Sequence, residues 1–131
     1  MTDNEIALDW YNRLADNKKK RIVATYGERE NREWLLLNSK EILRLYTKIH
    51  KIRDLFLICD HGKEFFTDCD DFASTYQIAI THIDYNIDTK VMTITCRRPG
   101  VLIGKAGRHI KELQERLECK IEIIESILEI I

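Results

Sequence analysis

The chain of 131 residues has little of several features that would place it in a special class. It contains one proline and five glycines, and 44% of its residues are hydrophobic, which excludes a disordered, collagen-like or low-complexity chain. No apolar run reaches the ~18 residues of a membrane helix. Acidic residues near the start leave no apolar stretch of the signal-peptide type. We therefore expect a cytoplasmic protein with a hydrophobic core and no membrane contact.

Neither charge nor cysteine content indicates a partner or a metal. Lys and Arg number 21 and Asp and Glu number 22, so any affinity for nucleic acid must come from local clusters. The four cysteines include no C-x-x-C pair, and Cys59, His61 and Cys69 have no evident fourth ligand for zinc. We expect free thiols, no bound metal and no cofactor.

A recognisable catalytic motif is also missing. No nucleophile stands near a histidine in a known pattern, and G-x-S-x-G is absent. The neighbours Asp60 and His61 are a pairing that arises by chance in a chain of this length. We therefore expect a protein that is not an enzyme.

Residues 1–65 are expected to form a mainly helical region. Thr2 and Glu5 make a capping-box pattern at its start, and the basic run 18–21 is expected to end the first helix. The stretch Arg21–Tyr26 is typical of a strand, whereas 28–37 fits either a helix or a strand.

A long amphipathic helix closes this first region. Ser39 is its expected cap, and Asp60, His61 and Gly62 are expected to break it. This break marks the best candidate for a boundary, and we place the end of the N-terminal region at residue 65.

Residues 66–125 alternate between helical and strand patterns. Apolar and polar residues alternate on both sides of a turn at 88–90, which predicts an antiparallel pair of strands. The expected order is helix, strand, strand, short helix, Gly-rich turn, helix and strand, over 67–79, 83–87, 92–96, 101–103, 104–107, 110–117 and 120–124. The fold class predicted for the whole chain is α+β.

Three interpretations of the Gly-rich turn compete. A P-loop needs four residues between its first glycine and its Gly-Lys pair, and then a Ser or Thr hydroxyl. Here only three residues separate Gly100 from Gly104, and Ala106 stands in place of the hydroxyl residue. A dinucleotide-binding turn needs G-x-G-x-x-G, whose first glycine pair is absent. The interpretation that remains is a G-x-x-G turn between two helices, where backbone N–H groups can approach a phosphate chain.

The segment Lys90–Lys111 carries charge of one sign. It holds six basic residues and no acid, in a chain with more acids than bases. The basic residues are Lys90, Arg97, Arg98, Lys105, Arg108 and Lys111. This one-sided segment indicates a surface for nucleic acid.

A ten-residue run surrounds the turn, Arg98-Pro99-Gly100-Val101-Leu102-Ile103-Gly104-Lys105-Ala106-Gly107, with Ile110 and Leu113 after it. It resembles the KH domain in its prokaryotic (type II) arrangement, and most closely the KH domain of the small-subunit ribosomal protein with the motif R-P-G-x-x-I-G-x-x-G. The similarity covers about 66–125. Because 1–65 do not resemble that ribosomal protein and no second domain follows, we expect a stand-alone KH protein.

The resemblance implies single-stranded RNA binding by a backbone clamp that holds about four nucleotides. Gly104 and Gly107 would be the hinges, and Lys105 and Ala106 the tip of the loop. Bases would lie in an apolar groove between the paired helices and the last strand, which Ile121 or Ile123 would help to line. The residues expected to contact nucleic acid are Arg97, Arg98, Ile103, Gly104, Lys105, Ala106, Gly107, Arg108 and Ile110.

Two other functions stay open at this point. One is a protein-interaction adaptor that uses the KH fold as a scaffold, and the other is binding of single-stranded DNA. The tail at 126–131 is apolar and must pack against its own N-terminal helices or against a second copy. A protein partner or self-association through the N-terminal helices or this tail is therefore a further expectation.

Overall fold

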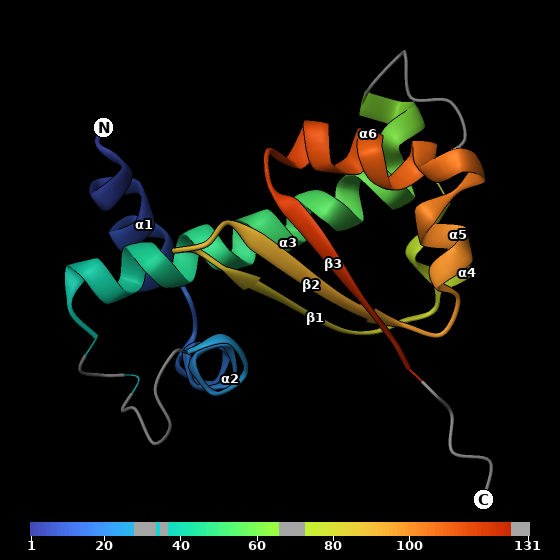
Figure 1. The fold of residues 1–131 in the computed structure, drawn as a ribbon. Coiled ribbons are helices and arrows are strands. Elements are labelled where there is room, and N and C mark those ends of the chain that lie inside the picture. Colours follow the sequence, from blue (N-terminus) through green and yellow to red (C-terminus); the bar gives the residue numbers. More distant parts are fainter. Residues whose placement is uncertain (28–33, 35–36, 66–72, 127–131) are drawn as a thin grey trace, which may run out of the picture. The chain divides into compact units, whose positions relative to one another are not determined.

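The computed structural model describes residues 1–27, 34, 37–65 and 73–126. They form helices and one three-stranded sheet, so the predicted α+β class is confirmed (Figure 1). The chain divides into two compact units, Met1–His50 and Lys51–Ile131. Helix α3 (Ser39–Phe65) crosses this division and gives its second half to the C-terminal unit, which thus begins before residue 66. None of the helices described is both long and apolar enough to cross a membrane.

The N-terminal unit contains α1 (Asp3–Asn12), α2 (Asp16–Tyr26) and the first half of α3. The predicted capping box is confirmed, because Oγ1 of Thr2 accepts a hydrogen bond from the Glu5 N–H at 3.2 Å. Two other predictions are wrong. The basic run 18–21 does not end α1 but lies within α2, and the predicted strand Arg21–Tyr26 is the second half of α2.

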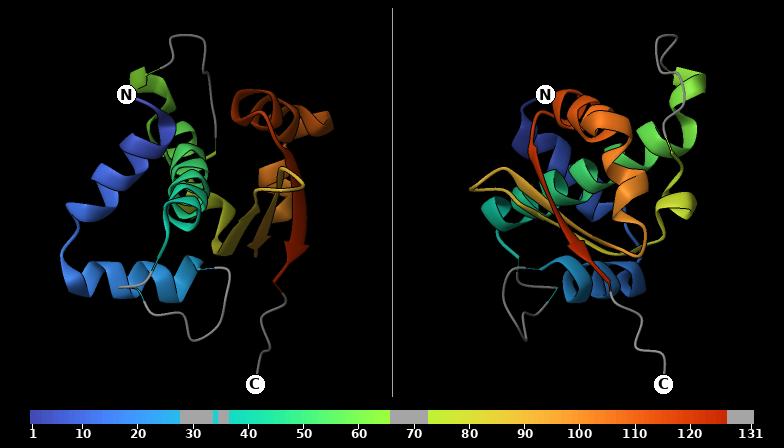
Figure 2. Two further views of the ribbon diagram at one scale, coloured as in Figure 1. Left: turned by 90° about the vertical axis from the view of Figure 1, so that its left-hand side faces the viewer. Right: turned by 45° about the vertical axis from the view of Figure 1, so that its right-hand side comes forward.

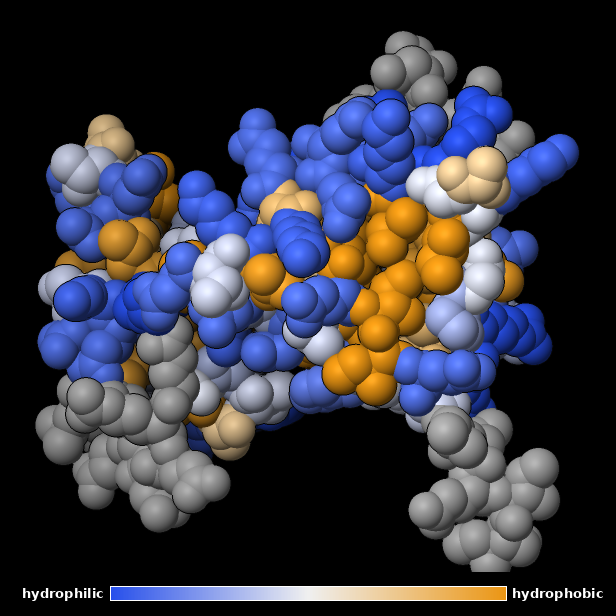
Figure 3. Space-filling view, in the orientation of Figure 1, coloured by the Kyte–Doolittle hydropathy of each residue, from blue (hydrophilic) through white to orange (hydrophobic). Residues whose placement is uncertain are grey.

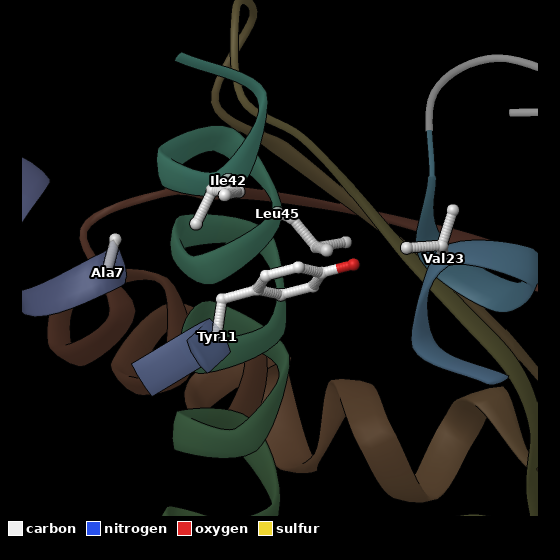
Figure 4. Packing of buried hydrophobic residues seen from close by; sticks show 5 residues of the cluster. All are labelled: Ala7, Tyr11, Val23, Ile42 and Leu45. Carbon is white, nitrogen blue, oxygen red and sulfur yellow. The ribbon is translucent and has the colours of Figure 1, made fainter. Parts of the chain in front are cut away.

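A small apolar core joins these helices. Its buried side chains come from all three elements and point toward one another in Figure 4, namely Ala7, Tyr11, Val23, Ile42 and Leu45. The Tyr11 hydroxyl donates a hydrogen bond to the Trp34 carbonyl oxygen at 2.6 Å. Burial of Val23 against this core explains why a β-branched residue is helical here, since packing outweighs a propensity of a few tenths of a kcal/mol.

Helix α3 starts with a capping box one residue before the predicted cap. Oδ1 of Asn38 accepts from the Glu41 N–H at 2.9 Å, and Oε1 of Glu41 accepts from the Asn38 N–H at 3.3 Å. Ser39, the predicted cap, is the first helical residue instead. The helix is interrupted at His61 (φ −130°, ψ 15°), within the predicted break at 60–62, and then continues to Phe65.

The sheet of the C-terminal unit has the order β1-β2-β3, with β1 (Ile80–Asn86), β2 (Val91–Cys96) and β3 (Lys120–Glu125). The predicted antiparallel pair is confirmed by β1 and β2, and β3 runs parallel to β2. Two further helices, α5 (Pro99–Ile103) and α6 (Arg108–Leu117), lie beside β3 (Figures 1 and 2). Their inward side chains, Leu102, Leu113 and Leu117, are almost fully buried.

The short helix α4 (Thr75–Ile78) precedes the sheet. The predicted helix start at Thr67 or Asp68 lies outside the described residues, and α4 begins at a capping box between Ser74 and Gln77. The helix ends at Ala79, whose φ of 58° is left-handed.

Candidate nucleic-acid interface

The Gly-rich turn occupies the middle of the connection between two parallel neighbours. The chain leaves β2, passes through α5, a 3-10 turn η2 (Lys105–Gly107) and α6, and returns to the sheet as β3. The buried leucines of α5 and α6 fix both helices against the rest of the unit. The turn is therefore held at both ends by packed elements, which is how folds position binding loops.

Gly104 adopts a backbone conformation that requires glycine. Its φ of 75° and ψ of 176° lie in a region open essentially only to glycine. A Cβ atom there would also stand 2.5 Å from the Cβ of His109. Gly107 is left-handed as well (φ 74°, ψ 12°), but nothing lies within 4 Å of the position of its Cβ. Position 104 thus requires glycine because of its backbone conformation and its close packing, whereas position 107 favours glycine because of its backbone conformation alone.

Lys105 and Ala106 form the exposed tip of the turn. The Gly104 N–H donates to the Gly100 carbonyl at 3.0 Å, and the Gly107 N–H donates to the Gly104 carbonyl at 3.2 Å. Ala106 takes a left-handed conformation (φ 55°, ψ 26°) without being glycine. These bonds close a short loop whose two tip residues are exposed.

His109 ties this turn to a distant part of the chain. Its Nδ1–H donates to the Leu102 carbonyl oxygen at 2.8 Å, and its Nε2 accepts from the Ala73 N–H at 3.1 Å. Since a carbonyl can only accept and an N–H can only donate, the ring is neutral with its proton on Nδ1. This side chain links the end of α5 and the start of α6 to the residue before α4. Sequence reasoning missed His109, because its partner Ala73 is far away in the chain.

The cations expected to bind phosphate are exposed around the turn. Arg97, Arg98, Lys105 and Arg108 all reach solvent, and so does Lys111 one turn further along α6. Gly107 is the N-cap of α6 and supplies no side chain to cap the first N–H groups of the helix. The positive end of the helix dipole and the exposed residues Lys105 and Arg108 therefore lie at the same junction, an arrangement that favours an anion.

An apolar face adjoins these cations. Figure 3 shows hydrophobic surface over α5, α6 and β3, bordered by hydrophilic side chains. The exposed apolar residues on these elements are Val101, Ile103 and Ile124, and Ile110 and Ile123 are half-buried. Ile121, a candidate for the groove, is buried in the core, whereas Ile124, which the sequence did not single out, is 51% exposed.

The cysteines of the described residues are structural. Cys59, Cys96 and Cys119 are buried thiols that form no disulfide, and Cys69 lies outside the described residues. Burial raises the pKa of the Cys96 and Cys119 thiols, so both stay protonated near neutral pH. Within the part of the chain that the structure describes, no three His, Cys, Asp or Glu side chains gather to hold a metal ion.

Comparison with known families identifies the second half of the chain. Residues 66–127 match the family model for the KH domain. This segment is similar to the KH domain, and it is called the KH domain below. KH domains in general bind single-stranded nucleic acids and are not catalytic modules. No curated protein and no solved structure gives a significant match to the chain.

The matched segment holds every residue that the sequence analysis proposed for nucleic-acid contact. Within the KH domain, the turn residues 104–107 and Arg108 lie together at the junction of α5 and α6. Arg97 and Arg98 stand at the other end of α5, just after β2. Ile103 and Ile110 flank the turn on the two helices, with Ile103 39% exposed. The proposed contacts thus follow α5 from one end to the other.

Proposed function

We propose that the KH domain binds single-stranded RNA, with the G-x-x-G turn at 104–107 as a clamp on the phosphate backbone. The observation that carries this proposal is the junction of α5 and α6. There a narrow turn, an uncapped helix start and the exposed cations Lys105 and Arg108 adjoin an apolar face. Phosphates would lie against the turn while bases rest on the apolar face. The protein would thereby act in RNA metabolism or in ribosome-associated work.

The sheet supports a finer assignment to the type II arrangement. A helix and an antiparallel strand pair precede the paired helices, and β3 then runs parallel to β2. This order agrees with the resemblance to the ribosomal KH domain. Because backbone clamping distinguishes sugars only through the 2′-OH, single-stranded DNA is the natural comparison ligand.

The clamp is tested by replacing Lys105 and Ala106 together with Asp. Both side chains are exposed, and Asp tolerates the left-handed conformation of Ala106 better than most residues. Two carboxylates would then face the phosphates, and we expect RNA affinity to fall by at least ~30-fold, or about 2 kcal/mol. Titration of labelled RNA and DNA oligomers gives the affinities, and the thermal midpoint should change little.

A matched control changes the net charge equally in the other compact unit. Asn17→Asp with Lys18→Asp alters charge by the same amount on exposed positions of α2, in the other compact unit. Acidic residues in the first turn of a helix are favourable, so folding should be retained. An equal loss of RNA affinity in the two double variants would show that the effect is non-specific and that the turn is not the clamp.

A further inference from the structure

A nearly fully exposed aromatic side chain stands at the far end of α5 from the turn. Tyr76 of α4 is 89% exposed, the largest exposure among the large hydrophobic residues described. Its helix is short but firmly held. Ser74 and Gln77 cap it, and the Asp60 carboxylate accepts from both the N–H and the Oγ1 of Thr75 at 2.8 Å.

The end of α4 is joined to two exposed arginines. The Arg97 N–H donates to the Ala79 carbonyl at 3.1 Å, and the Arg98 N–H donates to the Ile78 carbonyl at 3.2 Å. These bonds place the backbone of Arg97 and Arg98 directly against the last residues of α4. Three exposed residues, one aromatic and two cationic, therefore lie on adjoining backbone segments of the KH domain, which we call the α4 corner (Tyr76, Arg97 and Arg98).

The α4 corner lies within reach of a strand held at the turn. Helix α5 separates Arg98 from Gly104, and its five residues span roughly 7.5 Å at 1.5 Å per residue. Helices α4 and α5 are in contact, as Figure 1 also shows. The acid-free segment Lys90–Lys111 runs from one place to the other, so no carboxylate of this segment repels a phosphate chain along the way.

We propose that the α4 corner is a second contact for the same RNA strand, in which Tyr76 stacks on a base and Arg97 and Arg98 hold the adjoining phosphates. This inference extends the proposed RNA binding beyond the G-x-x-G turn. Stacking on an aromatic ring suits a base because every base presents a flat face, and a ring on an anchored helix loses little freedom on binding. The contact lengthens the bound strand beyond the four or so nucleotides held at the turn.

Oligomers of two lengths test the proposal. Tyr76→Ala should weaken binding of a ten-nucleotide RNA by about tenfold, within the range measured for base–aromatic stacking. A four-nucleotide RNA, which the turn alone can hold, should bind the variant as tightly as the unchanged protein. Tyr76→Phe keeps the ring and should bind both oligomers normally. Because Tyr76 is exposed, the thermal midpoint should stay the same in both variants.

A fluorescent base gives a second readout. An RNA with 2-aminopurine at successive positions should show quenching at one position outside the clamped nucleotides, and Tyr76→Ala should remove it. If the ten-nucleotide RNA binds the unchanged protein and Tyr76→Ala equally well, the α4 corner is not a contact, although the clamp stands. If neither oligomer binds the unchanged protein, the proposed function itself fails.

Discussion

Gly104 and Gly107 share a positive φ but stand in different surroundings. The position of a Cβ at Gly104 is filled by His109, whereas that at Gly107 is open. The first glycine is therefore part of the packing of the turn, and the second serves only its backbone path. The two alanine variants separate these roles.

We expect Gly104→Ala to destabilise the protein by at least ~3 kcal/mol, from backbone strain and overpacking together. Gly107→Ala should cost ~1 kcal/mol, the usual penalty for a left-handed alanine. Gly100, which has no atom within 4 Å of its Cβ position and no positive φ, offers a matched control that should cost less than either. Chemical denaturation measures all three, and equal losses at 104 and 107 would contradict this view of the turn.

His109 is the side chain through which the turn contacts a remote segment. Its two ring nitrogens bond to Leu102 and Ala73, one as donor and one as acceptor. A replacement must supply both functions to preserve the link.

His109→Ala should destabilise the protein by ~1–3 kcal/mol, because it removes the partner of the part-buried Ala73 N–H and of the Leu102 carbonyl. His109→Gln keeps one donor and one acceptor, and should recover part of that loss. RNA affinity should also be lower in His109→Ala than in His109→Gln, because the turn loses its support in the alanine variant. Denaturation and RNA titration of both variants check this, and equal stability of Ala and Gln would mean that packing alone matters.

Among the elements, α3 shows how a cap decides a helix start. Asn38 and Ser39 are both residue types that cap helices well, so the sequence did not separate them. Only Asn38 exchanges hydrogen bonds with Glu41.

Asn38→Ala should therefore cost ~1 kcal/mol of stability, the typical value for a lost cap. Ser39→Ala, in the first turn of the same helix, should be near neutral and serves as the control. Urea denaturation distinguishes them, and a larger loss at Ser39 would favour the cap that the sequence predicted.

An element could be predicted from the sequence when residues close to it in the chain decide its structure. The strands β1 and β2 and the helix α6 were predictable because alternation or a three-to-four spacing records which face is buried. Helix α2 was not, since Arg21–Tyr26 has strand-like residues and becomes helical only through the core around Val23. The G-x-x-G turn was recognisable from its glycines and cations. The hydrogen bond from Ala73 that supports the turn could not be predicted, and neither could the bonds that join α4 to Arg97 and Arg98. Both connect segments that are distant in the chain.

At the scale of the whole molecule, charge is unevenly spread. The net charge is −1, yet the segment Lys90–Lys111 is purely basic, so the rest of the chain is acidic on balance. Nucleic acid should thus be drawn to one part of the KH domain and repelled by much of the remainder.

The dependence of affinity on salt measures how many phosphates are bound. If Lys105, Arg108 and one of Arg97 and Arg98 each contact a phosphate, the slope of log affinity against log salt should be about −2 for a single strand. The Lys105→Asp, Ala106→Asp variant should have a shallower slope. A slope steeper than about −4 would bring in the basic run 18–21 as a further contact, and a flat response would contradict phosphate binding.

The parallel pairing of β2 with β3 has a consequence for how the site comes into being. Both glycines of the turn and the cations Arg97, Arg98, Lys105 and Arg108 precede β3 in the chain. The pairing of β3 with β2 sets Val91 beside Lys120 and so closes the connection that contains them. During synthesis, these residues leave the ribosome before the strand that draws the connection closed. We therefore expect the packing that supports the turn to be complete only when the last strand of the sheet has paired. During synthesis, the nascent chain therefore contains the whole G-x-x-G motif before it contains the strand that completes the fold around it.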